Sequence, residues 1–144
     1  MLVSQILKSK ADESVYTVPP TMMISDVARI LSEKRIGTVV ISRDGKAADG
    51  ILSERDIVRE IGARGVGCLS EPAEKYMTSK LVTCAAGDKA EEILQKMTDG
   101  RFRHIPVLED GQLVGLISIG DVVKARLAEL AMERNALEGM IMGH

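Results

Sequence analysis

The chain has 144 residues, of which 45% are hydrophobic and 28% charged, and its formal net charge is −2. This composition is typical of one globular domain, and it lacks the clustered basic residues and the aromatic platform of a nucleic-acid-binding protein. No apolar run approaches the roughly 20 residues of a membrane helix, and no signal peptide opens the chain. We therefore expect a cytoplasmic protein that binds neither nucleic acid nor membrane.

The first half of the chain predicts a β-α-β-β-α order of elements. Ile24, Val27 and Leu31 recur at the i, i+3 and i+7 positions of a helix with one apolar face. The runs on either side of Asp44-Gly45 are β-rich, and this dipeptide is a turn signal. In chain order we expect a strand at 17–18, a helix from about 24 to 31, strands at 38–41 and 50–52, and a helix that begins near 54.

The second half predicts the same order. Ala90, Ile93 and Met97 repeat the helical spacing, and Asp88 followed by Glu91 predicts a capping box at the start of that helix. In chain order we expect a short strand at 82–83, a helix from about 90 to 97, strands at 104–107 and 113–117, and a helix that begins near 119.

The agreement between the halves is an internal repeat. Residues 50–58 return as residues 115–123, sixty-five positions later, while upstream positions such as Thr17 and Thr83 match at a shift of sixty-six. The change of shift means that the first copy has one extra residue in its turn. Duplication followed by an insertion in this loop accounts for the pattern. Each copy has about 65 residues, a size at which a lone core is marginal, so we expect the two copies to share a core.

These features divide the chain into four parts. The first copy with its N-terminal segment covers residues 1–65, and the second copy covers residues 76–127. Glycines and Pro72 mark residues 66–75 as a linker. Residues 128–144 form a helical extension of the second copy. Cys68 and Cys84 lack the spacing of a metal site, and we expect both to be thiols and no metal to be bound.

An apolar stripe runs along the last predicted helix, from about Ile119 to Met140. Its residues are spaced by four, three, seven and four, and Arg134 stands where a further apolar residue belongs. A stripe of this heptad character needs a partner surface, so we expect a homodimer that involves the terminal helices; the alternative is a tail that folds back onto its own repeat. The stripe consists of Val123, Leu127, Leu130, Leu137 and Ile141.

A Ser-x-x-Asp motif follows the second long strand of each copy, as Ser53 with Asp56 and as Ser118 with Asp121. One interpretation is purely structural, with the serine as helix N-cap and the aspartate accepting a free N–H, although Asp reaches back less well than Glu. The other is a binding site. A helix N-terminus suits a phosphate, and a carboxylate one turn into the helix suits the two hydroxyls of a ribose. The motif alone leaves both interpretations open.

The repeated β-α-β-β-α unit, with a glycine, two apolar residues and Ser-x-x-Asp closing its second strand, resembles the CBS motif, named after cystathionine β-synthase. Two copies in tandem resemble a stand-alone CBS pair, or Bateman module, over about residues 3–127. The resemblance implies an α/β fold of α+β type, with the two motifs packed as a pseudo-twofold pair and related clefts for adenosine nucleotides between them. It implies a regulatory, signal-transducing sensor of AMP first, with ATP, ADP or NADH as alternatives, that acts on an unknown partner protein.

The resemblance and the motif together give the candidate ligand-binding residues. Thr38 and Val40 stand in the first copy where His104 and Pro106 stand in the second, and Arg55 is replaced by Gly120, so we expect two unequal sites. The candidates are Thr17, Ser53, Arg55, Asp56, Thr83, Arg103, His104, Ser118 and Asp121.

Two other classes of function compete with a nucleotide sensor. An enzyme finds little support, because the chain has two histidines and shows no nucleophile setting, glycine-rich phosphate loop or metal-ligand cluster. We therefore expect no catalytic activity and no catalytic cofactor. The remaining alternative is a protein-interaction module without a nucleotide ligand, in which the Ser and Asp residues only cap helices.

Overall fold

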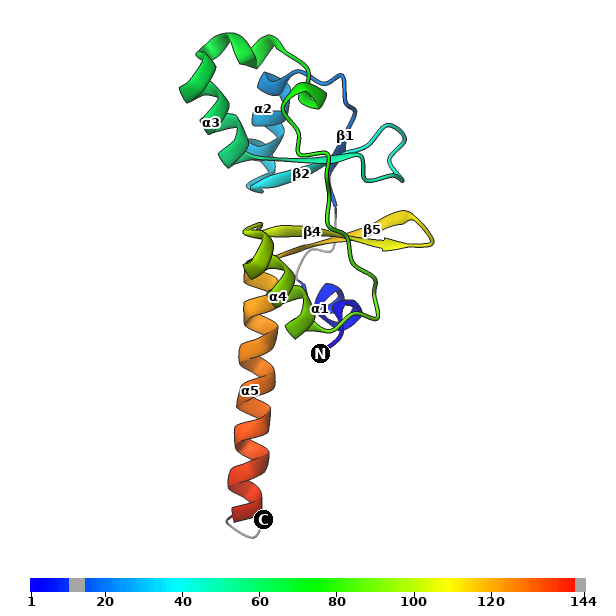
Figure 1. Cartoon of the computed structure of the whole chain (residues 1–144), viewed down its shortest axis with the longest axis vertical. Coiled ribbons are helices and arrows are strands. Elements are labelled where there is room, and N and C mark those ends of the chain that lie inside the picture. The colour runs from blue at the N-terminus through cyan, green and yellow to red at the C-terminus, as the bar shows by residue number, and fades with distance from the viewer. Residues whose placement is uncertain (11–14, 142–144) are drawn as a thin grey trace. The chain divides into compact units, whose positions relative to one another are not determined.

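The computed structural model describes residues 1–10 and 15–141, so that residues 142–144 of the predicted extension lie outside it. It confirms a mixed α/β fold with two related repeats and a long C-terminal helix (Figure 1). The first repeat has the predicted β-α-β-β-α order, and the second lacks the first strand of that order. The elements are α1 (Val3–Ser9), β1 (Thr17–Val18), α2 (Ile24–Lys34), β2 (Thr38–Ile41), β3 (Gly50–Ser53), α3 (Glu54–Arg64), the 3-10 turns η1 (Val66–Ser70) and η2 (Ala73–Lys75), α4 (Ala90–Gly100), β4 (His104–Glu109), β5 (Gln112–Ser118) and α5 (Ile119–Ile141).

The described residues form two compact units, each with one copy of the repeat. The first-copy unit holds residues 15–82 and 108–114, and the second-copy unit holds residues 1–10, 83–107 and 115–141. Each unit has its own cluster of buried apolar residues, so the expectation of one shared core was wrong. The physical reason is that each copy is completed by a segment that precedes the other copy in the chain.

The first-copy unit contains a three-stranded sheet in the order β1-β2-β3. β1 runs parallel to β2 with Thr17 opposite Val40, and β2 runs antiparallel to β3 with Thr38 opposite Ser53. All four residues of β2 are buried, as a central strand requires. The apolar faces of α2 and α3 complete a core of Val18, Ile24, Val27, Leu31, Val39, Ile41, Leu52, Ile57 and Ala73.

The second-copy unit contains most of the hairpin β4-β5, whose tip at residues 108–114 is assigned to the first-copy unit. The strand predicted at Val82-Thr83 is reduced to a single parallel bridge between Cys84 and Val107, with the Cys84 N–H 3.0 Å from the carbonyl oxygen of Pro106. Helices α1, α4 and α5 supply the rest of a core of Val3, Ile6, Cys84, Ala90, Ile93, Met97, Ile105, Val107, Ile117, Val122 and Ala125. Both cysteines are buried thiols, as predicted.

The segments that precede the two copies are exchanged. α1 precedes the first copy but packs on the second, where the N–H of Ala90 lies 2.9 Å from the carbonyl oxygen of Met1. The linker precedes the second copy but packs on the first, where the N–H of Ile24 lies 2.9 Å from the carbonyl oxygen of Glu71. In each unit, a borrowed segment therefore supplies a backbone acceptor to the first turn of a helix that has no side-chain cap.

This exchange explains why the capping box predicted at Asp88 and Glu91 does not form. α4 begins at Ala90 with Lys89 as its N-cap, and no side chain bonds the cap. The Asp88 carboxylate instead accepts the N–H of Ala85 at 2.9 Å and closes the preceding turn.

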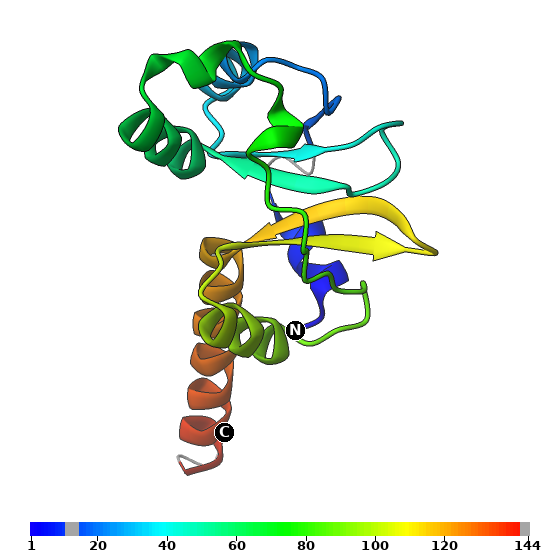
Figure 2. The same ribbon diagram turned by 45° about the horizontal axis from the view of Figure 1, so that its top comes forward.

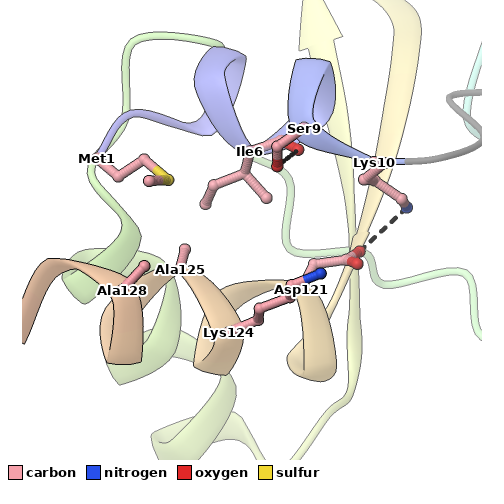
Figure 3. A pocket seen from close by; sticks show the side chains of 8 residues that line it. All are labelled: Met1, Ile6, Ser9, Lys10, Asp121, Lys124, Ala125 and Ala128. Carbon is pink, nitrogen blue, oxygen red and sulfur yellow. Dashed lines mark hydrogen bonds and ion pairs between the residues drawn. The ribbon is translucent and has the colours of Figure 1, made fainter. Parts of the chain in front are cut away.

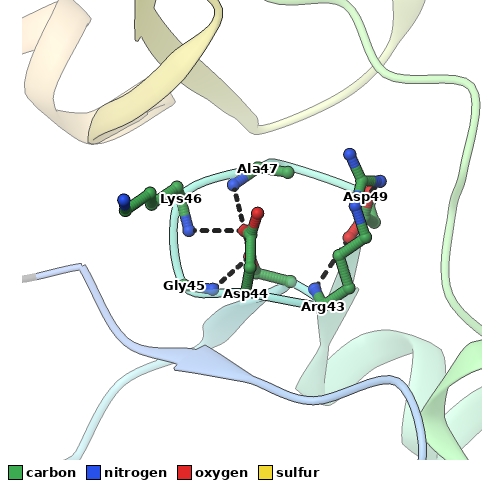
Figure 4. A network of polar contacts seen from close by, with 7 residues as sticks. Arg43, Asp44, Gly45, Lys46, Ala47 and Asp49 are labelled. Carbon is green, nitrogen blue, oxygen red and sulfur yellow. Dashed lines mark hydrogen bonds and ion pairs between the residues drawn. The ribbon is translucent and has the colours of Figure 1, made fainter.

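The one-residue insertion of the first copy lies in the loop between β2 and β3, where Asp44 organises the backbone (Figure 4). Its Oδ1 accepts the N–H groups of Lys46 and Ala47, each at 2.8 Å, and these two bonds are the main reason that its pKa lies below the ordinary value. Asp49 accepts the N–H of Arg43 at 2.8 Å. The extra residue is thus accommodated in a hydrogen-bonded turn without disturbing the register of β2 and β3.

Helix α5 confirms the predicted long terminal helix. Its first turns pack on α4 and α1 through Val122 and Ala125, and Figures 1 and 2 both show its later turns continuing beyond those helices. Leu127, Leu130 and Leu137 are 63%, 48% and 58% exposed. Among the described residues, no helix is both long and apolar enough to cross a membrane.

Candidate functional site

The first Ser-x-x-Asp motif stands at the junction of β3 and α3. Ser53 is the N-cap of α3, and its hydroxyl oxygen accepts the N–H of Asp56 at 3.2 Å. The Asp56 Oδ2 atom accepts both the N–H and the hydroxyl of Ser53 at 2.9 Å. The structural interpretation of the motif is therefore realised here, as a complete capping box.

The second motif stands at the junction of β5 and α5 and has nearly the same geometry. The Ser118 hydroxyl oxygen accepts the N–H of Asp121 at 3.1 Å, and Asp121 Oδ2 accepts the N–H of Ser118 at 2.9 Å. The expectation that Asp reaches back poorly was thus wrong in both copies. In each, the serine is the last residue of a strand, and its N–H donates to the aspartate Oδ2 at 2.9 Å.

Each aspartate also holds a cation that the sequence did not predict. Arg59 contacts Asp56 Oδ1 at 2.6 Å from one turn further along α3. Lys10 contacts Asp121 Oδ2 at 3.0 Å and donates to the carbonyl oxygen of Leu116, also at 3.0 Å. The i,i+3 spacing of Asp56 and Arg59 was a readable signal. Lys10 had no signal, because it precedes the first copy and reaches the second only through the exchanged α1.

The second-copy junction gathers further charged groups around Asp121. Partial burial opposes the charge of this carboxyl, but the Ser118 and Lys10 donors outweigh that effect and hold its pKa below the ordinary value. Burial lowers the pKa of His104, the Asp121 carboxylate partly counters this, and Lys10 and Arg103 reinforce it. The candidates His104, Arg103, Ser118 and Asp121 thus lie within one electrostatic neighbourhood.

A pocket of about 320 Å³ adjoins Asp121 in the second-copy unit (Figure 3). It lies between α1 and the first turns of α5, and its volume is within the range of small-molecule sites, roughly 300–1,000 Å³. Polar groups stand at one end, where Ser9, Lys10, Asp121 and Lys124 line it, and Met1, Ile6, Ala125 and Ala128 form an apolar remainder.

The other candidates are placed differently. Arg55 is exposed on α3 and lines a surface hollow with Glu54, Val58 and Arg59. The side chain of Arg103 is exposed, while its carbonyl oxygen accepts the N–H of Ile119 at 2.8 Å. In the first copy the corresponding carbonyl belongs to Gly37, so that unit has no side chain at this point.

The two threonines do not join the Ser-x-x-Asp motif of their own unit. Thr17 lies in the edge strand β1, with β2 between it and Ser53. Thr83 precedes the bridge of Cys84 to β4, with β4 between it and Ser118 on β5. Within the described parts of the chain, no group of three or more His, Cys, Asp or Glu residues is placed to hold a metal ion.

Two repeats with this element order and a Ser-x-x-Asp capping box at each second strand-to-helix junction define a tandem CBS-domain protein. The family model of the CBS domain matches residues 3–63 and 73–128, and the chain belongs to this family.

Its relatives include proteins from bacteria, archaea and plants. The CBS domain-containing protein CBSX3, mitochondrial, of Arabidopsis thaliana is 34% identical over 148 residues, which cover 98% of this chain and 72% of that protein. The crystal structure of the CBS-domain containing protein ATU1752 from Agrobacterium tumefaciens is 39% identical, with a TM-score of 0.82 over 88% of this chain and 99% of that one. The CBS domain protein PAE2072 from Pyrobaculum aerophilum, complexed with AMP, is 30% identical, with a TM-score of 0.77 over 92% and 99%.

Proposed function

We propose that this protein is a regulatory module that binds an adenosine nucleotide at its Ser-x-x-Asp junctions and signals to a partner protein. AMP is the first candidate, and ATP, ADP and NADH are alternatives. Membership of the CBS family supports an adenosine-type ligand, and the AMP complex of a 30%-identical relative supports AMP in particular. The observation that carries the proposal is the second-copy junction, where a partly exposed carboxylate stands among Lys10, Arg103 and His104.

The capping role of Asp121 is compatible with ligand binding. An ionised carboxylate offers about four lone-pair sites on its two oxygens, whereas the Ser118 N–H and Lys10 both approach Oδ2. The side chain is 22% exposed, so a ribose hydroxyl can approach the other oxygen. The ammonium of Lys10 and the N-terminus of α5 then supply positive potential for a phosphate.

The competing function is an interaction module whose Ser and Asp residues serve only as caps, which the completed capping boxes favour. The two functions differ in what the loss of the carboxylate changes. A ligand-binding Asp121 lowers nucleotide affinity when it is removed, by about 1.5–3 kcal/mol for a lost charge-assisted hydrogen bond. A capping Asp121 costs about 1 kcal/mol of stability and leaves the affinity intact.

Calorimetric titration of AMP, ADP, ATP and NADH into the wild type, Asp121→Ala and Asp56→Ala therefore tests the proposal. We expect at least one nucleotide to bind the wild type and Asp121→Ala to bind it about 10- to 150-fold more weakly. Asp88→Ala is the matched control, because Asp88 also accepts a backbone N–H three residues away but stands at no strand-to-helix junction. Unchanged affinity in both junction variants, or no binding of any nucleotide to the wild type, would refute the proposal.

A further inference from the structure

The outer half of α5 has no cover from the described chain. Every residue from Leu130 to Glu138 is exposed, as are Met140 and Ile141. An isolated helix of about 12 residues is marginal in water, since its propensity alone does not offset the entropy of ordering it. The outer half of α5 therefore needs contact with a second surface to stabilise its helical turns.

The exposed apolar stripe lies on a face of α5 different from the one that packs on its own unit. Val122, Ala125 and Glu129 face the unit and are buried or half-buried. The stripe follows a heptad in which Leu127, Arg134 and Ile141 are a positions, and Val123, Leu130 and Leu137 are d positions. Its exposed fraction reaches 77% at Ile141, so the whole stripe is open to a partner.

This stripe is complementary to itself when two copies run antiparallel. With the twofold axis beside Met132, residues equally distant from that position face each other in a and d layers. Leu127 then meets the partner's Leu137, Val123 meets the partner's Ile141, and Leu130 meets the partner's Arg134. Every a position faces a d position in this one register, and the single charge in the stripe faces a leucine near the axis.

Of the charges that flank the stripe, Lys124 and Glu138 agree with the same register, whereas Glu133 faces the partner's Glu133 near the axis. Lys124 and Glu138 are the residues that follow d positions, and the antiparallel arrangement sets Glu138 beside the partner's Lys124. Each end of the paired helices thus holds one Lys124–Glu138 pair, with the lysine from one copy and the glutamate from the other. A parallel pair in register instead sets Arg134 against the partner's Arg134 in one layer and Glu133 beside the partner's Glu138, which places like charges together.

We propose that two copies of this chain associate through antiparallel α5 helices, with Leu127 opposite the partner's Leu137 and Leu130 opposite the partner's Arg134. The interface lies mostly beyond residue 128, where the match to the CBS domain ends. It therefore belongs mostly to this chain's own extension.

Sedimentation of the full chain tests the surface. We expect a dimer for the wild type, and we expect Leu127→Glu to raise the dimer dissociation constant about tenfold or more, because a charge is then buried against the partner's Leu137. Met132→Glu is the matched control, since Met132 is 67% exposed and lies on the far side of the heptad. It should leave the dimer unchanged. A monomeric wild type, or equal effects of the two variants, would overturn the proposal.

Oxidative cross-linking tests the register. We expect a mixture of Leu130→Cys and Arg134→Cys chains to form a disulfide-linked heterodimer, and each variant alone to remain largely uncrosslinked. A homodimeric cross-link of Leu130→Cys alone would show a parallel pair and overturn the register. The native thiols do not interfere, because Cys68 and Cys84 are both buried.

Discussion

The ammonium nitrogen of Lys10 lies 3.0 Å from a carboxylate oxygen of Asp121. A residue that precedes the first copy of the repeat thereby sets the charge environment of the motif in the second. The two side chains are 26% and 22% exposed, so solvent screens this pair less than an ordinary surface pair.

Replacement of Lys10 should raise the pKa of Asp121. In Lys10→Met the carboxylate loses its ion pair but keeps the Ser118 donors, so its pKa should move toward 3.8. Carbon-detected NMR of the aspartate carboxyl during an acid titration measures this shift. Lys124→Met is the control, because Lys124 lines the same pocket but is not among the groups that lower this pKa. Equal titration of Asp121 in the wild type and in Lys10→Met would contradict the ion pair.

The two copies should bind nucleotide unequally. Arg59 already contacts Asp56 Oδ1 in the first copy, where Glu54 adds a negative charge, whereas Lys10, Arg103 and His104 surround Asp121 in the second. We expect a calorimetric titration to show one tight site and one weak or empty site, and Asp121→Ala to weaken the tight one. Two equivalent, independent sites would contradict this assignment.

Acidification should destabilise the protein through His104. Burial lowers the pKa of this imidazole below its ordinary 6.5, so the unfolded chain takes up a proton at a pH where the folded protein does not. The free energy of unfolding should therefore fall as the pH drops below about 6.5. Urea unfolding at pH 7.5 and pH 5.5 measures the difference, which should be smaller in His104→Gln. An identical pH dependence in the variant would show that another group is responsible.

Two glycines should respond in opposite ways to alanine. A Cβ atom at Gly50 would lie 2.8 Å from Met77 Cγ and 3.1 Å from Met77 Cβ, so Gly50→Ala should cost about 1–3 kcal/mol of stability. Gly62 lies within α3 with nothing inside 4 Å of such an atom, and Gly62→Ala should add about 0.5–1 kcal/mol. Denaturant unfolding compares the two. A neutral Gly50→Ala would mean that Met77 does not pack on β3.

The sequence predicted those features of the fold that depend on short-range patterns. Helical spacing located α2 and α4, and the internal repeat gave both junctions with Ser53, Asp56, Ser118 and Asp121 at the N-terminus of a helix. Features that depend on long-range contact were missed. Lys10 reaches Asp121 across more than one hundred residues, and no local pattern encodes that distance.

The ends of α2 and α4 illustrate a second limit of sequence patterns. Both helices end at an arginine in the left-handed conformation, Arg35 at φ 55° and Arg101 at φ 57°. Glycine is the usual residue at such a position, so the local composition gave no signal. In the sequence, these two helix ends are related only by the shift of sixty-six residues between Arg35 and Arg101. The structure shows that the two copies share this left-handed helix end as well as the Ser-x-x-Asp motif.

The exchange of leading segments means that the repeat and the unit that folds are not the same stretch of chain. A protein with a single copy of this repeat would leave the first turn of one helix without its backbone acceptor, unless a second molecule lent its own leading segment. With both copies in one chain, the leading segment that completes each helix comes from the same molecule. Cleavage between the copies would separate each core from the piece that completes it, and the two halves would be expected to recover their structure only together.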